Sequence, residues 1–199
     1  MPRVSREQTE LNRAAIEHAA STLFREKGIS GTSVADLMSA AGLTHGGFYG
    51  HFSSKDELAA VACAHAFTQS LQRWEQRVAG QPDSAARSSV IEGYLSRKNL
   101  RDVGNACPAL TFATDVAREP SEKPVHAAYR AGVAGLLEVL TALDSAEHPE
   151  ERRKQALVQL SMMVGAMTLA RAVQDDVLAD ELITAAREHL LSDADRTSI

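Results

Sequence analysis

Hydrophobic residues recur at helical spacing along most of the chain, and short polar or glycine-containing segments interrupt them. Apolar positions three and four residues apart lie on one face of a helix, so each repeat predicts one amphipathic helix. Glycine after a repeat and proline at the start of the next are typical of helix boundaries. We therefore expect an all-α fold of about nine helices. They span about residues 9–27, 55–78, 85–103, 108–118, 124–143, 149–173 and 176–191, with two short ones between residues 32 and 52.

The segment after residue 31 predicts the first short helix. Ser33 and Asp36 have the spacing of a capping box, in which each side chain accepts a hydrogen bond from the backbone of the other. Gly42 then supplies a tight turn. Four apolar residues share the inner face of this helix: Val34, Leu37, Met38 and Ala41.

The second short helix begins after Thr44, whose hydroxyl can cap it. Phe48 and Phe52 are four residues apart and are expected to point into the core. Gly46 and Gly47 each cost roughly 1 kcal/mol of helix stability relative to alanine. Such a cost in a short helix indicates close approach of its backbone to another surface. The outward positions are small or polar: Thr44, His45, Gly46, Tyr49 and Gly50.

Two short helices across a glycine turn form a helix-turn-helix unit, whose second helix can enter a DNA major groove. Directly after it, Ser54 and Glu57 predict a second capping box at the start of the long helix. The run TSVADLMSAAGLTHGGFYGHFSSKDEL, residues 32–58, resembles the N-terminal signature of the tetracycline-repressor (TetR) family of bacterial transcriptional regulators. The resemblance covers about residues 9–60, and beyond them it concerns only length and helical pattern.

The resemblance implies two domains and a function. Residues 1–54 would form a helix-turn-helix DNA-binding domain, and residues 55–199 a domain for effector binding and dimerisation. The implied protein is a cytoplasmic homodimeric repressor that binds a palindromic operator in double-stranded DNA. A small-molecule effector would release it, because effector and operator each weaken binding of the other by the same factor.

Eight residues are predicted to contact DNA, from their outward positions and from the resemblance. His45 can donate to or accept from a base edge, and Tyr49 offers its hydroxyl to phosphate and its ring to a thymine methyl. Lys55 would meet phosphate at the positive end of its own helix. The alternative makes the same residues exposed or capping residues of a structural hairpin. The predicted set is Thr32, Ser33, Thr44, His45, Gly46, Tyr49, His51 and Lys55.

The last two predicted helices are expected to form a dimer interface. The helix over 149–173 begins charged and becomes apolar almost all round between Leu157 and Ala172. A helix of that kind has to be covered on every side. Neighbouring helices of the same chain could cover it, or its own core could cover one side and a second subunit the other. We expect the second, because a symmetric dimer presents two reading helices to a palindromic site.

The charge of the chain does not favour a general nucleic-acid binder. The formal net charge is −5, whereas such proteins are usually basic. In the first sixty residues, acidic side chains exceed basic ones by one. Arg3, Arg6 and Lys55 nevertheless lie where the TetR family meets phosphate. We therefore expect a modest, strongly salt-sensitive affinity that depends on dimerisation.

Composition also bears on location and on metal chemistry. No apolar run approaches the roughly 20 residues of a membrane span, and the N-terminus MPRVSREQTE has no apolar export signal. Cys63 and Cys107 are too few and too far apart for a disulfide framework, and free thiols fit the cytosol. Neither a metal nor a cofactor is expected, since no metal-ligand spacing joins the nearby candidates His45, His51, Cys63 and His65.

Cys107 precedes Pro108 near a predicted helix start, where the helix dipole favours a thiolate. It is a candidate sensor for electrophiles or oxidants, and the alternative is a plain buried residue. An enzyme could use Cys107 with His126 as a base, but no spacing places them together and no triad, phosphate-loop or metal motif occurs. A helical protein-binding adaptor is a third class. We expect a regulator and no enzyme.

An effector pocket is implied only by the resemblance. Aromatic, methionine and polar residues of the later helices could line it, although such residues are also ordinary core. The candidates are Trp74, Tyr94, Cys107, Phe112, His126, Tyr129, Met163 and Met167.

Overall fold

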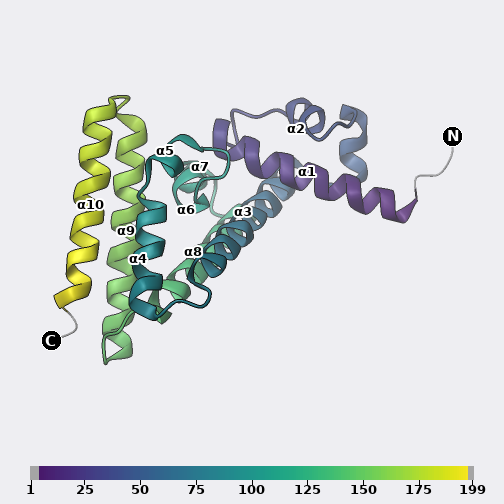
Figure 1. Ribbon diagram of the computed structural model, residues 1–199. Helices are drawn as coiled ribbons and strands as arrows, with labels where there is room; N and C mark the ends of the chain where they lie inside the picture. The colour runs from purple at the N-terminus through teal and green to yellow at the C-terminus, as the bar shows by residue number, and fades with distance from the viewer. Residues whose placement is uncertain (1–4, 197–199) are drawn as a thin grey trace. The chain divides into compact units, whose positions relative to one another are not determined.

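The computed structural model describes residues 5–196 and is helical throughout, which confirms the predicted all-α class (Figure 1). No β-strand occurs among these residues. The elements are α1 (Arg6–Lys27), α2 (Val34–Ala40), the 3-10 helix η1 (His45–Gly50), α3 (Lys55–Val78), α4 (Asp83–Tyr94), α5 (Arg97–Arg101), α6 (Pro108–Thr111), α7 (Ala113–Arg118), α8 (Val125–Ala142), α9 (Pro149–Ala172) and α10 (Asp176–Arg196).

The chain divides into two compact units. The first unit contains the chain up to Thr68 together with Cys107–Gly132, and the second contains Gln69–Ala106 and the chain from Val133 onward. The long helices α3 and α8 each contribute residues to both units. The predicted boundary between residues 54 and 55 concerns the functional domains and stays a prediction.

Helix α1 begins earlier than the sequence pattern predicts. Ser5 has extended backbone angles, and its hydroxyl oxygen accepts a hydrogen bond from the Gln8 N–H at 3.1 Å. This N-cap starts the helix at Arg6, three residues before the first expected position. The inner face of α1 is fully buried at Ile16, Ala20 and Phe24.

Two predicted helices are each interrupted in the structure. The helix expected over 85–103 ends at Tyr94, and a separate short helix, α5, follows. Ser96 causes the restart, since its hydroxyl accepts a hydrogen bond from the Asn99 N–H at 3.2 Å. The helix expected over 108–118 is divided at Phe112 into α6 and α7. Both predictions of a single helix were wrong. In the first case, periodicity alone does not detect the Ser96 cap inside the apolar repeat, whereas Phe112 makes no side-chain capping hydrogen bond.

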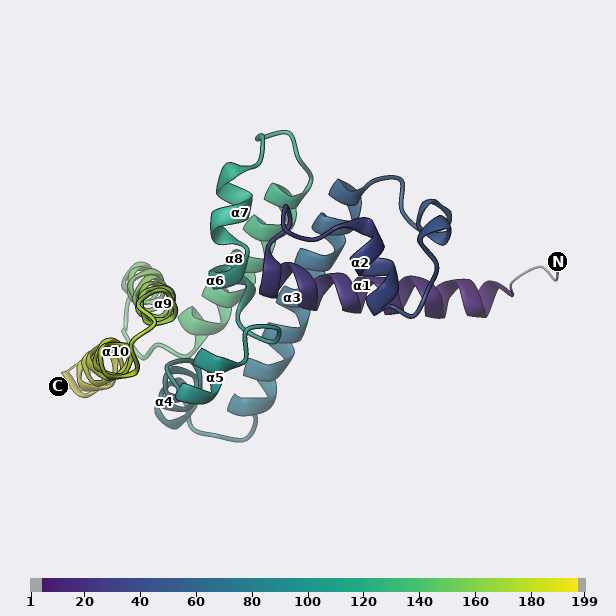
Figure 2. The same ribbon diagram turned by 90° about the horizontal axis from the view of Figure 1, so that it is seen from above.

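In the second unit, α9 and α10 lie side by side, and α4 lies next to α10 (Figure 2). In the same unit, the ring of Trp74 of α3 and the ring of Tyr94 of α4 pack edge to face, with centroids 6.3 Å apart. Arg87 of α4 links the three helices through two hydrogen bonds. It donates to the Gln159 side chain of α9 and to the Leu190 carbonyl of α10, each at 3.2 Å.

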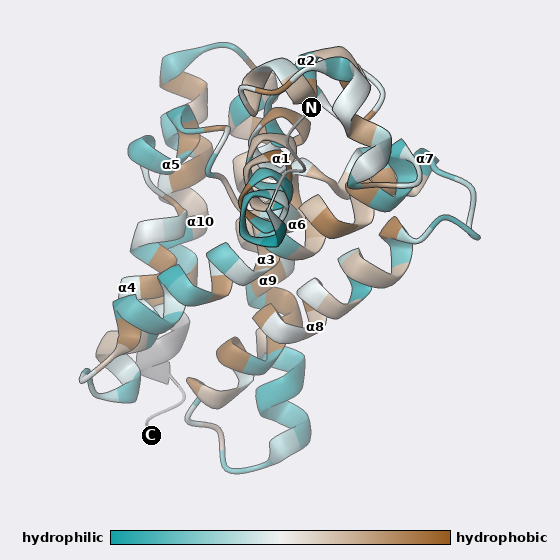
Figure 3. Ribbon diagram, turned by 90° about the vertical axis from the view of Figure 1, so that its right-hand side faces the viewer, coloured by the Kyte–Doolittle hydropathy of each residue, from teal (hydrophilic) through white to brown (hydrophobic). Residues whose placement is uncertain are grey.

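Helix α9 is covered on one side only by the described chain. Its first turns are hydrophilic and the remainder is largely hydrophobic (Figure 3). Leu157, Val158 and Leu169 are 46%, 48% and 53% exposed. The opposite face is buried at Ala156, Gln159, Leu160, Met163, Met167 and Ala170.

Candidate nucleic-acid interface

The predicted capping box of α2 is present. The Asp36 N–H donates to the Ser33 hydroxyl oxygen at 3.1 Å, and the Ser33 N–H donates to the Asp36 carboxylate at 3.0 Å. Hydrogen bonds from the Ser33 hydroxyl and backbone lower the pKa of Asp36. Leu37 and Met38 are buried on the inner face of the helix. The local sequence therefore fixes both the start of α2 and its orientation.

A Schellman motif ends α2. The Leu43 N–H donates to the Met38 carbonyl at 2.8 Å, and the Gly42 N–H donates to the Ser39 carbonyl at 3.0 Å. Gly42 has a φ of +71°, a conformation that glycine adopts without steric cost. The predicted glycine turn is thus confirmed, and it reverses the chain between α2 and the next helix.

The second helix of the hairpin, η1, differs from the expectation in two respects. It is a 3-10 helix rather than an α-helix. Thr44 has extended N-cap angles, yet its side chain makes no capping hydrogen bond, so its predicted capping role is wrong. A run of glycines weakens α-helical propensity, and η1 is a single short segment, as is usual for 3-10 helices.

One side of η1 is buried and the other is exposed. Phe48 is 0% exposed and Phe52 is 2% exposed, while Tyr49 is 72% exposed. The Tyr49 ring meets the Phe48 ring edge-on, with centroids 5.2 Å apart. Thr44, His45, Gly46 and Gly50 are also exposed. The predicted outward face therefore exists, and contact of this face with DNA stays a prediction.

The remaining predicted DNA contacts differ in accessibility. Ser33 is exposed, and Lys55 is half-buried at the start of α3. Thr32 is 1% exposed and its hydroxyl donates to the Gly28 carbonyl at 2.8 Å. The hydroxyl of Thr32 is thus used within the protein, so direct contact with phosphate does not fit its position. Arg3 lies outside the described residues.

The second predicted capping box forms only in part. The Glu57 N–H donates to the Ser54 hydroxyl oxygen at 3.1 Å, as expected. The Glu57 carboxylate instead accepts from Ser53, at 2.8 Å from its backbone nitrogen and 2.6 Å from its hydroxyl. These two hydrogen bonds lower the pKa of Glu57. The predicted box was wrong in one residue, and the true arrangement ties α3 to the segment just after η1.

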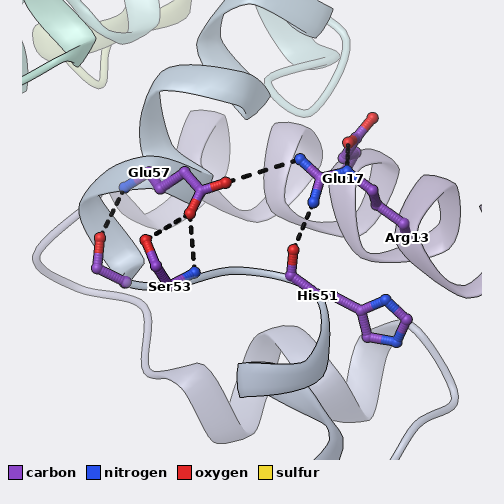
Figure 4. Close-up of polar contacts among 6 residues, drawn as sticks. Arg13, Glu17, His51, Ser53 and Glu57 are labelled. Atoms are coloured by element: carbon purple, nitrogen blue, oxygen red, sulfur yellow. Dashed lines mark hydrogen bonds and ion pairs between the residues drawn. The ribbon is translucent and has the colours of Figure 1, made fainter.

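Arg13 of α1 joins this segment from the other side (Figure 4). Its guanidinium donates to the His51 carbonyl and pairs with Glu17 at 3.0 Å. It also lies 3.8 Å from the Glu57 carboxylate and 4.2 Å above the centroid of the Phe52 ring. Only the four-residue spacing of Arg13 and Glu17 was visible in the sequence. The contacts with residues 51–57 depend on the fold, and they have no local signal in the sequence.

Residues 16–62 match the sequence model of one protein family, described as bacterial regulatory proteins of the tetR family. That range contains the capped α2, the glycine turn and η1, in the arrangement just described. This helix-turn-helix segment carries the sequence signature of the TetR family.

Named relatives of the chain are transcriptional regulators of the helix-turn-helix type. The regulator YfiR of Bacillus subtilis is 28% identical over 111 residues, which cover 56% of this chain and 53% of that protein. The regulator TtgR of Pseudomonas putida is 40% identical over 58 residues, 29% of this chain and 28% of the relative. The chain thus spans about half the length of YfiR and less of TtgR.

Solved TetR structures share the fold over nearly the whole chain. A regulator from Chloroflexus aurantiacus superposes with a TM-score of 0.77 at 24% identity, covering 94% of this chain and 95% of that one. The reduced form of NemR from Escherichia coli gives 0.73 at 18% identity, covering 90% and 94%. The TetR fold therefore extends beyond the segment that carries the sequence signature.

The predicted effector residues of the chain are distributed over both compact units. Trp74, Tyr94, Met163 and Met167 belong to the second unit and are buried. The others belong to the first unit: Cys107, Phe112, His126 and Tyr129. Effector binding by either group stays a prediction.

Within the first unit, Tyr129 anchors the predicted effector residues. Its hydroxyl donates to the Ala109 carbonyl at 2.7 Å, and its ring packs on Phe67 with centroids 5.6 Å apart. Burial raises the pKa of Tyr129 to about 12, and the nearby Cys107 and Cys63 add to the shift. The His126 ring nitrogen Nε2 lies 3.1 Å from the Glu119 carbonyl. These three contacts hold half-buried side chains of the first unit in place.

Both cysteines are free thiols and buried. Cys107 is the N-cap of the four-residue helix α6, as the sequence predicted for a helix start. Burial raises the pKa of Cys63 to about 12. No group of three His, Cys, Asp or Glu suited to a metal ion occurs among the described residues. Within the same part of the chain, no helix has both the length and the hydrophobicity needed to cross a membrane.

Proposed function

We propose that the protein is a homodimeric transcriptional repressor that inserts η1 into the major groove of a palindromic operator. The observation that carries this proposal is the two-sided character of η1. Phe48 holds the helix on the protein with 0% exposure, while Tyr49 beside it is 72% exposed. Although the Tyr49 ring meets Phe48 at its edge, most of its surface is free of its own chain, and an exposed aromatic on a glycine-bearing helix suits readout of a nucleic-acid surface.

The proposed contacts follow from chemistry and position. His45 and Tyr49 would meet base edges, and Ser33, Thr44 and Lys55 would meet phosphates. Gly46 would let the sugar-phosphate backbone approach closely, because it has no side chain and no protein atom lies within 4 Å of the place where a Cβ would be. We also keep His51 as a phosphate contact through its ring and omit Thr32, whose hydroxyl is buried.

The uncovered face of α9 and α10 supports dimerisation. Leu157 and Val158 border an open hollow of about 520 Å³, which Ser161 and Met162 also line. Near the start of α10, Val177 and Leu178 are 69% and 43% exposed. Contiguous exposed apolar surface of this kind marks an association site. A second copy of the same face would cover it with two-fold symmetry.

Effector release would require coupling between the later helices and the DNA-reading hairpin. Two polar contacts within the first unit link the segment 107–132 to residues just before and just after that hairpin. The Ile29 N–H donates to the Asp115 carboxylate at 2.6 Å, and Lys123 pairs with Asp56 at the start of α3. An effector that shifts this segment would also shift the hairpin, so its binding and operator binding would be linked. Cys107 starts the same segment, which keeps a thiol-reactive effector among the candidates.

Selection of bound sequences from random double-stranded DNA tests the proposal. We expect a palindrome whose half-sites lie about one helical turn apart or a multiple of that spacing. Repeating the selection at two salt concentrations should show a steep loss of affinity as salt rises. No enrichment at either concentration would refute DNA binding and would favour the protein-binding adaptor.

A further inference from the structure

The guanidinium of Arg13 contacts the backbone just after η1 and the Glu57 side chain of α3 (Figure 4). It also lies over the aromatic ring of Phe52 between them. Nη1 donates to the His51 carbonyl, Nε lies 3.0 Å from the Glu17 carboxylate, and Nη2 lies 3.8 Å from the Glu57 carboxylate. The guanidinium carbon lies 4.2 Å from the Phe52 ring centroid. All three nitrogens of this side chain are therefore directed at protein groups, although the side chain is 39% exposed.

The hydrogen bond from Arg13 lies at the C-terminal end of η1. The last carbonyls of a helix have no partner within the helix, and η1 is only six residues long. So short a 3-10 helix cannot fix its own orientation. His51 is its C-cap residue, so a donor at the His51 carbonyl fixes the end of η1. Glu57 holds the same connecting segment through Ser53, at 2.6 and 2.8 Å.

We propose that Arg13 is a positioning residue for DNA reading: it fixes the orientation of η1 against α1 and α3 without touching DNA. The inference rests on the proposed function, because the orientation of η1 matters only if η1 reads DNA. Arginine is required since a planar fork can stack on Phe52 while reaching the His51 carbonyl and Glu57. A lysine ammonium carries the charge but lacks this geometry.

Salt dependence separates positioning from a direct phosphate contact. Operator affinity is measured against salt concentration for the intact chain and the variants Arg13→Lys, Arg13→Gln and Lys55→Gln. Both Arg13 variants should lose about 10- to 100-fold in operator affinity. The slope of log affinity against log salt concentration should stay that of the unaltered protein. Lys55→Gln should lower the slope by about one. Retained affinity in Arg13→Lys, or a lowered slope in Arg13→Gln, would show that Arg13 meets phosphate and would overturn the proposal.

A matched control and a stability measurement separate positioning from general folding. Arg101 of α5 is exposed, and Arg101→Lys should leave affinity and slope unchanged. All variants are compared at a temperature where circular dichroism shows them fully folded. If the affinity lost by Arg13→Lys follows its unfolded fraction, the residue is merely structural and the proposal fails.

Hydrogen exchange without DNA provides a readout that is independent of the proposed function. The amides of Gly47, His51 and Phe52 donate within and just after η1, at 3.0, 2.9 and 3.0 Å. In Arg13→Lys these amides should exchange faster, while those of α9 and α10 keep their protection. Unchanged exchange at the three amides would refute the proposed role of Arg13 and would leave the proposed function unaffected. If Arg13→Lys exchanges faster but the unaltered protein binds no DNA, Arg13 does orient η1 and the proposed function is refuted.

Discussion

At the scale of single residues, adjacent positions of η1 differ in burial, and the proposed function assigns folding to one and DNA reading to the other. Phe48 is fully buried, and its neighbour Tyr49 is 72% exposed. Arg13 is neither a buried core residue nor a freely exposed one, because its side chain is partly exposed while its guanidinium contacts other protein groups. Substitutions at these three positions should therefore differ in what they change: stability at Phe48, affinity at Tyr49, and the order of η1 at Arg13.

The first prediction concerns acid stability of the helix-turn-helix segment. Hydrogen bonds from Ser53 lower the pKa of Glu57 from its ordinary value of 4.5. A lowered folded-state pKa stabilises the protein above the unfolded-state pKa, and this contribution is lost as pH falls through the folded-state value. In a pH titration of the melting temperature below pH 5, Glu57→Gln should flatten the fall. An equally steep fall in the variant would contradict this assignment.

The second prediction concerns the two thiols. Burial raises the pKa of Cys63 to about 12, so almost no thiolate exists at neutral pH. In a Cys107→Ser variant, the native protein should resist iodoacetamide at pH 8 and react only after unfolding. Mass spectrometry measures the alkylated fraction. Reaction of the native variant at the rate of a free thiol would show that Cys63 is accessible.

At the scale of elements, local sequence predicts the hairpin well and the contacts between elements poorly. Ser33 with Asp36 and the turn at Gly42 are short-range features, and both are present as expected. The 3-10 form of η1 could not be read from periodicity, since apolar spacing over six residues does not distinguish a 3-10 helix from an α-helix. The break at Ser96 and the bridge made by Arg13 were missed for related reasons. A cap can interrupt an apolar repeat, and a contact 38 residues along the chain has no local signal.

The third prediction compares two glycines of the hairpin. Gly42 has a φ of +71°, whereas Gly46 is not among the residues with positive φ, and a Cβ at either would meet no atom within 4 Å. Gly42→Ala should therefore destabilise the protein by about 1 to 2 kcal/mol through backbone strain. Gly46→Ala should change stability by less than about 1 kcal/mol but weaken operator binding. Denaturant unfolding and fluorescence anisotropy measure the two effects, and equal destabilisation by both variants would refute the distinction.

At the scale of the whole molecule, we expect a negatively charged chain to bind DNA specifically only if two copies of η1, each binding weakly, contact the operator together. The net charge is −5, so a single head gains little from phosphate attraction. Pairing through the exposed face of α9 and α10 would hold two copies of η1 at a fixed separation. DNA binding and dimerisation are thus expected to fail together.

The fourth prediction tests the dimer face. Leu169 of α9 is 53% exposed, and Leu11 of α1 is 58% exposed. Leu169→Glu should shift the protein toward monomer in sedimentation velocity and weaken operator binding, because it buries a charge in the interface. Leu11→Glu, a matched change outside that face, should leave the assembly intact. A monomeric unaltered protein at every concentration, or a dimer unaffected by Leu169→Glu, would exclude this interface.

The most direct measurement of the central claim is operator binding by Tyr49→Ala on the selected palindrome. The side chain is exposed, so the variant should keep the melting temperature and the dimer of the unaltered protein. Its specific affinity should fall by about tenfold or more, while its weak binding to unrelated DNA should change little. A folded, dimeric variant with unchanged operator affinity would contradict the account that this face of η1 reads DNA.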